Sequence, residues 1–223
     1  MNKTNNKSSR QPRSKIVFQK LKETIIFGEK LPGTRLIPAD LEKEFQIGRV
    51  PIREALLELA QTGLVISEPY KGVIVAQPPT LDEIREIFEI RFLLDGMAAE
   101  TAAAIVSDEV ISEMQQIHSE MCNYSSTSEP FFSLNHDFHM ILYEASGMNH
   151  LCQAIQMMID KVQAFRNRYP FELTDYSIFN RGHEDILNGL RQRDAAKVKE
   201  SLVSNVRDGY ETLVATYKKY AHR

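Results

Sequence analysis

The pattern of apolar and polar positions changes near residue 77 of the 223-residue chain. Before this point, apolar residues recur at helical spacing in three short stretches, and two β-rich runs then flank a Pro-Tyr-Lys-Gly turn. After it, helical spacing continues with no competing strand pattern. The pattern predicts a mainly α protein, with an N-terminal winged helix-turn-helix and a C-terminal all-α six-helix bundle. The expected helices are 14–28, 38–45, 49–63, 81–107, 108–123, 130–146, 149–169, 175–191 and 194–221, and the expected strands are 64–67 and 73–76.

These elements divide the chain into four parts. Residues 1–13 are polar and basic with almost nothing to bury, which predicts a disordered arm. Two prolines end the last strand and stiffen a short linker at 77–80. We therefore expect a winged helix-turn-helix DNA-binding domain at 14–76 and a separate helical domain at 81–223.

The predicted helix at 49–63 has different chemistry on its two faces. Its apolar stripe consists of Ile52, Ala55, Leu56 and Leu59. Arg49 and Arg53 are four positions apart, so they lie together away from that stripe, and Pro51 suits the first helical turn. Guanidinium groups at the exposed start of a packed helix favour contacts with DNA phosphates and guanine edges. The alternative interpretation is that both arginines are surface residues that serve solubility.

The charge distribution agrees with a first part that binds nucleic acid. The formal net charge is −3, but residues 1–76 contain thirteen Lys and Arg against eight Asp and Glu, whereas residues 77–223 contain fourteen against twenty-two. A basic first third joined to an acidic remainder is typical of a DNA-binding module attached to a domain of another kind. The alternative interpretation is that the two domains differ in net charge only for reasons of solubility.

Composition and cysteine usage restrict where the protein works. The apolar share of 43% is sufficient for a real core. No apolar run reaches the roughly 18 residues of a membrane span, and the polar N-terminus lacks the apolar segment of a secretory signal. Cys122 and Cys152 have no metal-type spacing and are expected to be reduced thiols. We therefore expect a cytoplasmic protein with no membrane partner.

Polar residues interrupt the apolar stripes of four predicted helices in the second part. These residues are Arg91, Asp95, Asn135, His139, His183 and Asn205. Because each stripe should face the bundle core and buried polar groups need partners, we expect them to converge on a polar cavity. A second interpretation of Arg91 and Asp95, which are four apart, is a simple ion pair. His118 and His136 lie off these stripes and are expected to be incidental.

Several segments resemble one known family. Four segments of the first part resemble the GntR superfamily of bacterial transcription regulators. They are Leu-Pro-Gly-Thr-Arg-Leu at 31–36, Gly-Arg-Val-Pro-Ile-Arg-Glu-Ala-Leu at 48–56, Leu-Ala-Gln-Thr-Gly-Leu-Val at 59–65 and Gly-Val-Ile-Val at 72–75. Three segments of the second part resemble the FadR-type (FCD) effector domain of this superfamily. They are Arg-Phe-Leu-Leu-Asp at 91–95, Asn-His-Asp-Phe-His at 135–139 and His-Glu-Asp-Ile at 183–186. The count of six helices is similar to the VanR-like branch.

The resemblance implies a transcription regulator, usually a repressor, that binds a pseudo-palindromic operator in double-stranded DNA as a homodimer. By position, Arg49 and Arg53 would contact DNA, with at least one of them reading a guanine. Arg35, Lys71 and Gly72 would contact phosphates and fix the register.

This chain departs from the family beside Arg49. The family usually has Ser or Thr at the position of Gly48 and Thr at the position of Val50, so two hydroxyl contacts with phosphate are expected to be missing. Val50, which precedes Pro51 at the start of the helix, would instead touch a thymine methyl group. This departure changes the expected operator sequence and leaves the DNA binding itself intact.

The resemblance also implies a divalent metal, zinc or nickel, that holds a small carboxylate together with nearby arginines. By position the ligands would be Asn135, His139, His183 and Asn205. The family has Asp at the first of these positions and His at the last, and an amide oxygen is a poor ligand for zinc or nickel. We therefore expect weak or absent metal binding and a carboxylate effector held by hydrogen bonds that include Arg91. Arg166 is a candidate second anion clamp, although a surface position is the favoured interpretation.

Three functions compete at this point. The first is a regulator whose affinity for DNA changes when the effector binds. The second is a DNA-binding regulator with a structural cavity that does not respond to small molecules. The third is a metal-dependent hydrolase, in which His139 and His183 hold the metal and Glu184 or Asp137 is the base. The winged region argues against the third, so no enzyme activity is expected.

Overall fold

The computed structural model describes residues 12–68, 70, 72–124, 129–167 and 177–220. The chain forms two compact units, Met1–Pro78 and Pro79–Arg223. The predicted mainly α fold, a winged helix-turn-helix followed by an all-α bundle, is confirmed. Of the predicted N-terminal arm at 1–13, residues 1–11 lie outside the described part of the chain.

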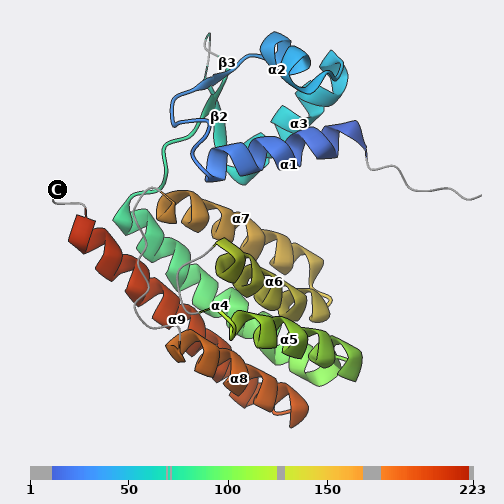
Figure 1. Cartoon of the computed structure of the whole chain (residues 1–223), viewed down its shortest axis with the longest axis vertical. Coiled ribbons are helices and arrows are strands. Elements are labelled where there is room, and N and C mark those ends of the chain that lie inside the picture. The colour runs from blue at the N-terminus through green and yellow to red at the C-terminus, as the bar shows by residue number, and fades with distance from the viewer. Residues whose placement is uncertain (1–11, 69, 71, 125–128, 168–176, 221–223) are drawn as a thin grey trace, which may run out of the picture. The chain divides into compact units, whose positions relative to one another are not determined.

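The first unit combines helices with a small antiparallel sheet (Figure 1). In chain order its elements are α1 (Arg13–Ile26), β1 (Arg35–Leu36), α2 (Pro38–Phe45), α3 (Arg49–Thr62), β2 (Val65–Glu68) and β3 (Gly72–Val75). The strand order is β1-β3-β2, and both pairs are antiparallel. The predicted hairpin of β2 and β3 is present. The segment expected only as a short extended piece supplies β1 as a third strand.

The packing of α1 against α3 forms the core of this unit. The buried side chains of this interface include Val17, Leu21, Ile52, Ala55 and Leu59. These residues belong to the apolar stripes that the sequence predicts at helical spacing. Because the buried stripe fixes how α3 is rotated about its axis, the opposite face, which carries Arg49 and Arg53, is left at the surface.

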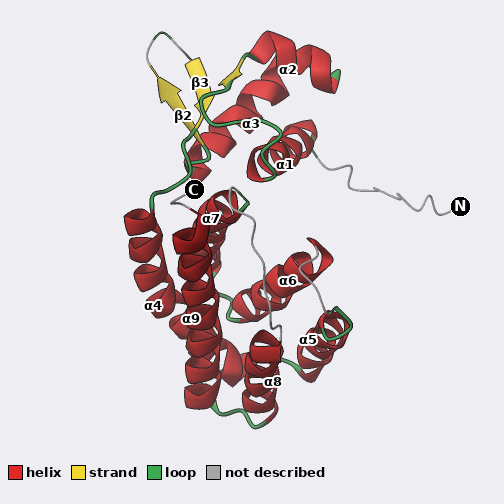
Figure 2. Ribbon diagram, turned by 60° about the vertical axis from the view of Figure 1, so that its left-hand side comes forward, coloured by secondary structure: helices red, strands yellow, loops and turns green. Residues whose placement is uncertain are grey.

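Within the described ranges the second unit contains the six predicted helices. They are α4 (Leu81–Ile105), α5 (Asp108–Met121), α6 (Glu129–Ala145), α7 (Asn149–Arg166), α8 (Ser177–Arg191) and α9 (Ala195–Tyr220). Helix α9 packs along α4 and α8, and α4 also contacts α6 and α7 (Figure 2). Helix α5 packs against α6 and α8. This arrangement allows side chains from several helices to meet in one interior.

Polar caps mark where the first two helices of this unit begin. The Thr80 hydroxyl accepts a hydrogen bond from the backbone N–H of Glu83, and the Glu83 carboxylate accepts one from the N–H of Thr80 at 2.7 Å. This reciprocal capping box satisfies two donors that the helix itself leaves free. Ser107 caps α5 by accepting from the N–H of Val110. None of the helices in the described residues combines the length and apolar character needed to cross a membrane.

Candidate functional site

The exposed face of α3 is the first candidate site. Arg49 is the first residue of the helix, and Gly48 precedes it with no side-chain hydrogen bond to the first turn. Arg49 and Arg53 are exposed, and neither forms an ion pair within the described part of the chain. Val50 is 67% exposed and Leu57 is 69% exposed on the same side. The first turn contains no acidic residue, so backbone N–H groups and guanidinium groups are together available to an anion.

The edge of the sheet adds a second cationic position. Arg35 of β1 lies opposite Ile74 of β3 and is exposed. Gly72 begins β3 with φ +79°, a conformation that L side chains rarely adopt. A methyl group on Gly72 would lie 3.9 Å from the Arg35 guanidinium, so the two residues lie next to each other. Lys71, predicted to act with them, lies outside the described residues.

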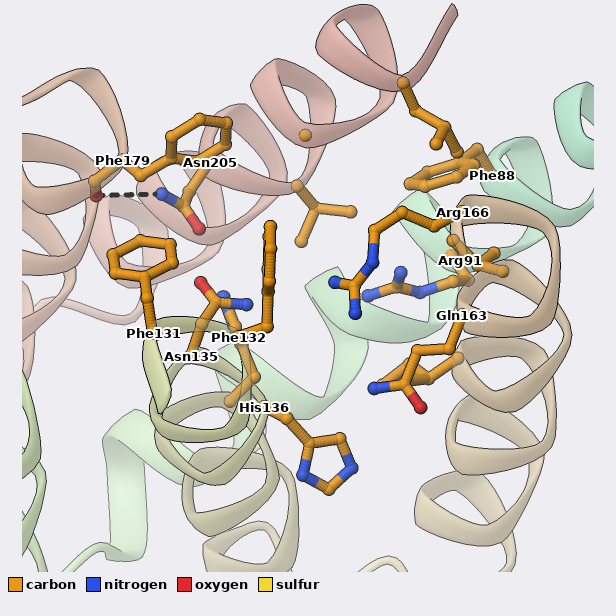
Figure 3. A pocket seen from close by; sticks show the side chains of 16 residues that line it. Phe88, Arg91, Phe131, Phe132, Asn135, His136, Gln163, Arg166, Phe179 and Asn205 are labelled. Carbon is orange, nitrogen blue, oxygen red and sulfur yellow. Dashed lines mark hydrogen bonds between the residues drawn. The ribbon is translucent and has the colours of Figure 1, made fainter. Parts of the chain in front are cut away.

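The second candidate site is a cavity of about 140 Å³ inside the helical unit (Figure 3). Helices α4, α6, α7, α8 and α9 contribute to its wall. The polar lining residues are Arg91, Asn135, His136, His139, Gln163, Arg166 and Asn205. The remaining described wall is formed by four phenylalanines, by aliphatic side chains and by Gly209. Of the polar residues that the sequence analysis expected at the cavity, Arg91, Asn135, His139 and Asn205 line it and Asp95 and His183 do not; Arg166, the candidate second anion clamp, also lines it.

Arg91 is a buried arginine with a fixed partner. It is 7% exposed, and its Nη2 donates to Oδ2 of Asp95 at 2.9 Å and to the hydroxyl of Tyr143 at 3.5 Å. Burial raises the pKa of Asp95, while the charge of Arg91 opposes that effect. Nε of Arg91 and Oδ1 of Asp95 have no hydrogen-bond partner among the described residues. Both the ion pair and the cavity position expected of Arg91 are thus present.

His139 and His183 form a buried contact at the cavity wall. Their Nε2 atoms lie 3.3 Å apart, so one ring donates an N–H to the other. Burial, together with the charge of Arg91, lowers the pKa of His139 to about 3. Burial also lowers the pKa of His183 well below its ordinary value. Both rings are therefore neutral near pH 7, and His183 lies behind His139 rather than among the described lining residues.

Asn205 is anchored to the neighbouring helix. Its Nδ2 donates to the carbonyl oxygen of Phe179 at 3.2 Å (Figure 3). A methyl group on Gly182 would lie 2.5 Å from this nitrogen, so glycine is required for the close approach of α8 and α9. This bond uses one of the two N–H groups of the amide, so the second N–H and the amide oxygen are what Asn205 can offer to a partner.

The described residues do not provide a complete metal site. The 3.3 Å between the Nε2 atoms of His139 and His183 would allow both to bind one ion. However, no group of three or more His, Cys, Asp or Glu suited to a metal ion occurs within the described ranges. The two other expected ligands, Asn135 and Asn205, offer neutral amide oxygens, which zinc and nickel bind poorly.

Arg166 and His136 have a larger role than the sequence analysis expected. Arg166 is half-exposed and lines the cavity, with its guanidinium carbon 3.9 Å from the centroid of the Phe132 ring. His136 also lines the cavity, and its Nε2 lies 3.1 Å from Oε1 of Gln156 on α7. The sequence could have predicted the position of His136. It is three residues before His139 on α6, and residues three apart lie on neighbouring parts of the same helix face.

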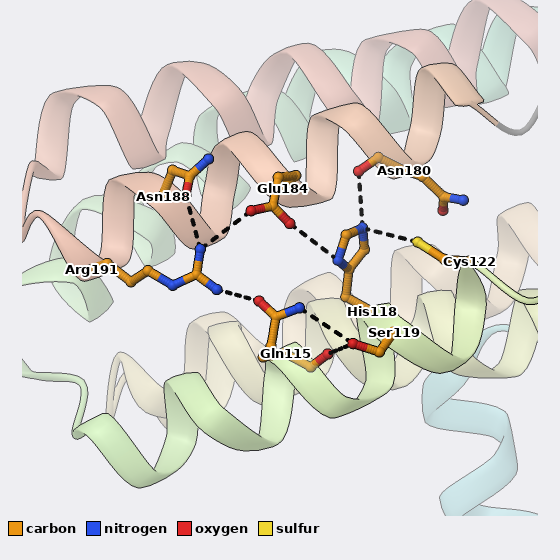
Figure 4. Close-up of polar contacts among 8 residues, drawn as sticks. All are labelled: Gln115, His118, Ser119, Cys122, Asn180, Glu184, Asn188 and Arg191. Atoms are coloured by element: carbon orange, nitrogen blue, oxygen red, sulfur yellow. Dashed lines mark hydrogen bonds and ion pairs between the residues drawn. The ribbon is translucent and has the colours of Figure 1, made fainter.

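His118 was also missed. It is buried between α5 and α8, where its Nε2 lies 3.0 Å from the carbonyl oxygen of Asn180 and its Nδ1 lies 3.4 Å from Glu184 (Figure 4). The sulfur of Cys122 lies 3.6 Å from the same Nε2. The spacing of His118 from Met114 and Met121 places it on the buried face of α5. This contact joins two helices and is separate from the cavity lining.

Known protein families match both units of the chain. The family model described as "Bacterial regulatory proteins, gntR family" matches residues 13–75, and the FCD domain model matches residues 86–208. The transcriptional repressor RspR of Escherichia coli is 24% identical over 209 residues, covering 91% of this chain and 90% of that protein. The gluconate operon transcriptional repressor of Bacillus subtilis is 24% identical over 200 residues, covering 86% and 81%. The solved structure of E. coli McbR/YncC has a TM-score of 0.80 at 21% identity, covers 93% of this chain and 100% of that one, and supports the fold.

Proposed function

Since this chain belongs to the GntR family of bacterial transcription regulators and carries an FCD domain, we propose that it is a repressor whose affinity for its operator is modulated by a small carboxylate bound in the cavity. The relatives are DNA-binding regulators and not enzymes, which removes the hydrolase interpretation. By thermodynamic reciprocity, a ligand that weakens DNA binding is itself bound less tightly when DNA is present.

The charge of the cavity wall is the observation that supports an anionic ligand. Arg91, which is paired with Asp95 behind the wall, and Arg166 both line the cavity, and no carboxylate belongs to its described lining. His139 is neutral near pH 7 because burial lowers its pKa to about 3. A guanidinium group in a water-poor cavity binds a carboxylate through two parallel N–H···O contacts. A small carboxylate is therefore the ligand class that best fits the cavity.

The proposed DNA contacts belong to three places in the first unit. Arg49 and Arg53 reach base edges and phosphates from the start of α3, where the N-terminal amides also favour a phosphate. Arg35, Gly72 and, by its place in the sequence, Lys71 contact the backbone at the edge of the sheet. These backbone contacts fix the register of α3 in the major groove without reading sequence.

Val50 is the proposed specificity element. A β-branched apolar side chain that is 67% exposed at the start of α3 contributes nothing to the core, and its contact with a thymine methyl group would remove apolar surface from water. We expect thymine beside the guanine that an arginine reads. Two-fold related copies would read a pseudo-palindrome, so the active form is proposed to be a homodimer.

The effector is proposed to bind without a metal ion. Only His139 and His183 are strong ligands at the position expected for a metal, and each uses its Nε2 in the contact with the other. The carboxylate would instead accept hydrogen bonds from Arg91 and Arg166, with amide groups completing its surroundings. A stoichiometric zinc or nickel ion that stays bound to the purified protein through dialysis against a chelator would contradict this part of the proposal.

One experiment tests the proposal as a whole. Operator fragments are selected from genomic DNA with the full-length protein, and the affinity is then measured by fluorescence anisotropy over a series of salt concentrations and carboxylates. We expect affinity to fall steeply with salt and to change when a particular carboxylate is added. In vitro transcription from the selected fragment should decrease when the protein is added. DNA binding that no carboxylate alters would support the structural-cavity alternative instead.

A further inference from the structure

We infer that the cavity takes a small aromatic monocarboxylate of the benzoate type, an inference that rests on the proposed carboxylate-responsive function. Four phenyl rings form part of the cavity wall, and they come from three helices. They are Phe88 of α4, Phe131 and Phe132 of α6, and Phe179 of α8. Ring faces and edges attract a flat aromatic guest through stacked and edge-to-face contacts that a saturated guest does not make.

The arginines are presented in a way that favours a planar acid. The guanidinium carbon of Arg166 lies 3.9 Å from the centroid of the Phe132 ring, and that of Arg91 lies 5.3 Å from the centroid of Phe88. A guanidinium that lies against a ring can still donate N–H groups from its edge, and it binds a carboxylate in its own plane. Nη2 of Arg91 already donates to Asp95 and Tyr143, so the other N–H groups of Arg91 would serve the guest. In a benzoate the ring is conjugated and coplanar with the carboxylate. The guest ring would therefore continue from the guanidinium plane toward the phenyl walls.

The volume of the cavity suits a guest with a single ring. Its volume of about 140 Å³ is similar to that of an engineered apolar cavity of about 150 Å³ that accommodates benzene. A long acyl chain would exceed this volume. A sugar acid has a suitable volume, but several of its hydroxyl groups would face Phe131, Phe179 and the aliphatic wall without hydrogen-bond partners, which is unfavourable.

The positions of the charged groups indicate one carboxylate rather than two. Arg91 and Arg166 lie on one side of the cavity, and Phe131, Asn135 and Asn205 lie on the other (Figure 3). Within the described lining, no cationic side chain faces the arginines from that opposite side. The second carboxylate of a dicarboxylate would therefore lie against a phenyl ring and neutral amides, where it would lose hydration without gaining a cation.

Calorimetric titration of the full-length protein with five acids tests this inference. The acids are benzoate, cyclohexanecarboxylate, gluconate, adipate and octanoate, and benzamide serves as the neutral control. We expect benzoate to bind and to raise the melting temperature, with affinity about tenfold above that of cyclohexanecarboxylate, which has the same size and charge but is not flat. Gluconate, adipate, octanoate and benzamide should bind more weakly than either ring acid.

The outcomes separate this inference from the proposed function. Stronger binding of gluconate, adipate or octanoate than of benzoate would overturn the aromatic inference while leaving a carboxylate-responsive regulator in place. Equal affinities for benzoate and cyclohexanecarboxylate would also overturn it. Absence of binding by all five acids would overturn the inference and count against the carboxylate effector of the proposed function as well.

Substitutions of the cavity phenylalanines test whether their rings cause the preference for benzoate over cyclohexanecarboxylate. In Phe131→Leu and in Phe132→Leu, the ratio of the benzoate affinity to the cyclohexanecarboxylate affinity should fall from about ten toward one. Phe165→Leu is the matched control, because Phe165 is a buried ring of the same unit that does not belong to the cavity lining. The ratio compares two ligands on one protein, so a general loss of stability does not change it. An unchanged ratio in whichever cavity variant folds would overturn the inference.

Discussion

The two units use arginine in opposite ways. In the first, Arg49 and Arg53 project from α3 into solvent, and neither has an ion-pair partner within the described residues. In the second, Arg91 is 7% exposed and bound to Asp95 and Tyr143. In the proposed function an exposed guanidinium acquires its main partner only when DNA binds, so its removal should spare the fold. A buried guanidinium is part of the fold, so its pair cannot be broken without a structural cost.

The largest expected effect concerns the exposed arginines. The double substitution Arg49→Ala/Arg53→Ala should weaken operator binding about a hundredfold or more, since each good contact with a base is worth about 1–3 kcal/mol. Fluorescence anisotropy at fixed salt measures this loss. The melting temperature should stay within a degree or two of the parent value, because surface substitutions of this kind change stability little.

A matched control for this experiment is Lys20→Ala, which removes an exposed cation of the same unit that lies near Glu23. It should leave operator affinity almost unchanged. If the double variant binds the operator as tightly as the parent protein, α3 is not the element that reads DNA. The exposed arginines of the first unit would then have no function that sets them apart from the buried Arg91 of the second.

The next effect concerns the buried pair. Asp95→Ala leaves the Arg91 charge without its partner and should lower the free energy of unfolding by about 3–5 kcal/mol. The double substitution Arg91→Met/Asp95→Leu removes both charges and should recover most of that loss. Urea denaturation followed by circular dichroism measures both. An Asp95→Ala protein as stable as the parent would show that the pair is solvated rather than buried.

A smaller effect is expected in the pH dependence of stability. The unfolded chain takes up a proton at His139 near pH 6.5, whereas burial lowers the pKa in the folded state to about 3. The contribution of His139 to the free energy of unfolding should therefore be constant above this window and fall as the pH decreases from 6.5 toward 3. His183, whose pKa burial also lowers, adds to the dependence in the same direction. His139→Gln should remove about one proton from this dependence, or about 1 kcal/mol per pH unit. Asp95, whose raised pKa acts in the opposite direction, is common to both proteins and cancels in the difference.

Urea denaturation at pH 7, 6 and 5 measures this difference. His150→Gln is the control for the substitution itself, since His150 is an exposed residue at the start of α7. Equal slopes for the parent and the His139→Gln protein would mean that His139 takes up its proton at the same pH in the folded and unfolded states.

The smallest expected effect is that of a single methyl group. Replacing the proposed thymine of each half-site by uracil removes only the 5-methyl group and should weaken binding by the parent about fourfold, as the burial of one methylene-sized group predicts. In the Val50→Ala variant the same replacement should have little effect. A uracil penalty of equal size in both proteins would assign the thymine preference to another residue or to DNA shape.

The two units also differ in how much of them could be predicted from sequence. The faces of α3 follow from spacing alone, because a stripe of buried residues determines which residues lie opposite it. The six bundle helices follow in the same way. Strand β1, Arg35–Leu36, is only two residues long, too short to give an alternating pattern, and it becomes a strand only by pairing with β3.

Inside the bundle, spacing indicates which residues face inward but gives no information on which of them meet. It placed His139 and His183 on inward faces, yet their 3.3 Å contact and the position of His183 behind the cavity depend on how α6 and α8 approach each other. The choice between cavity and surface for Arg166 could not be made from sequence for a related reason. A long side chain at the end of a helix reaches solvent or interior according to its neighbours, here the ring of Phe132.

The glycine at position 182 makes the proposed effector response sensitive to a single substitution. It belongs to the helical unit and is absent from the described cavity lining, yet adding one carbon atom there would force Asn205 away from Phe179. If the proposed effector response holds, one codon change between α8 and α9 would be enough to retune or silence it, while every residue proposed to contact the effector or the operator is retained.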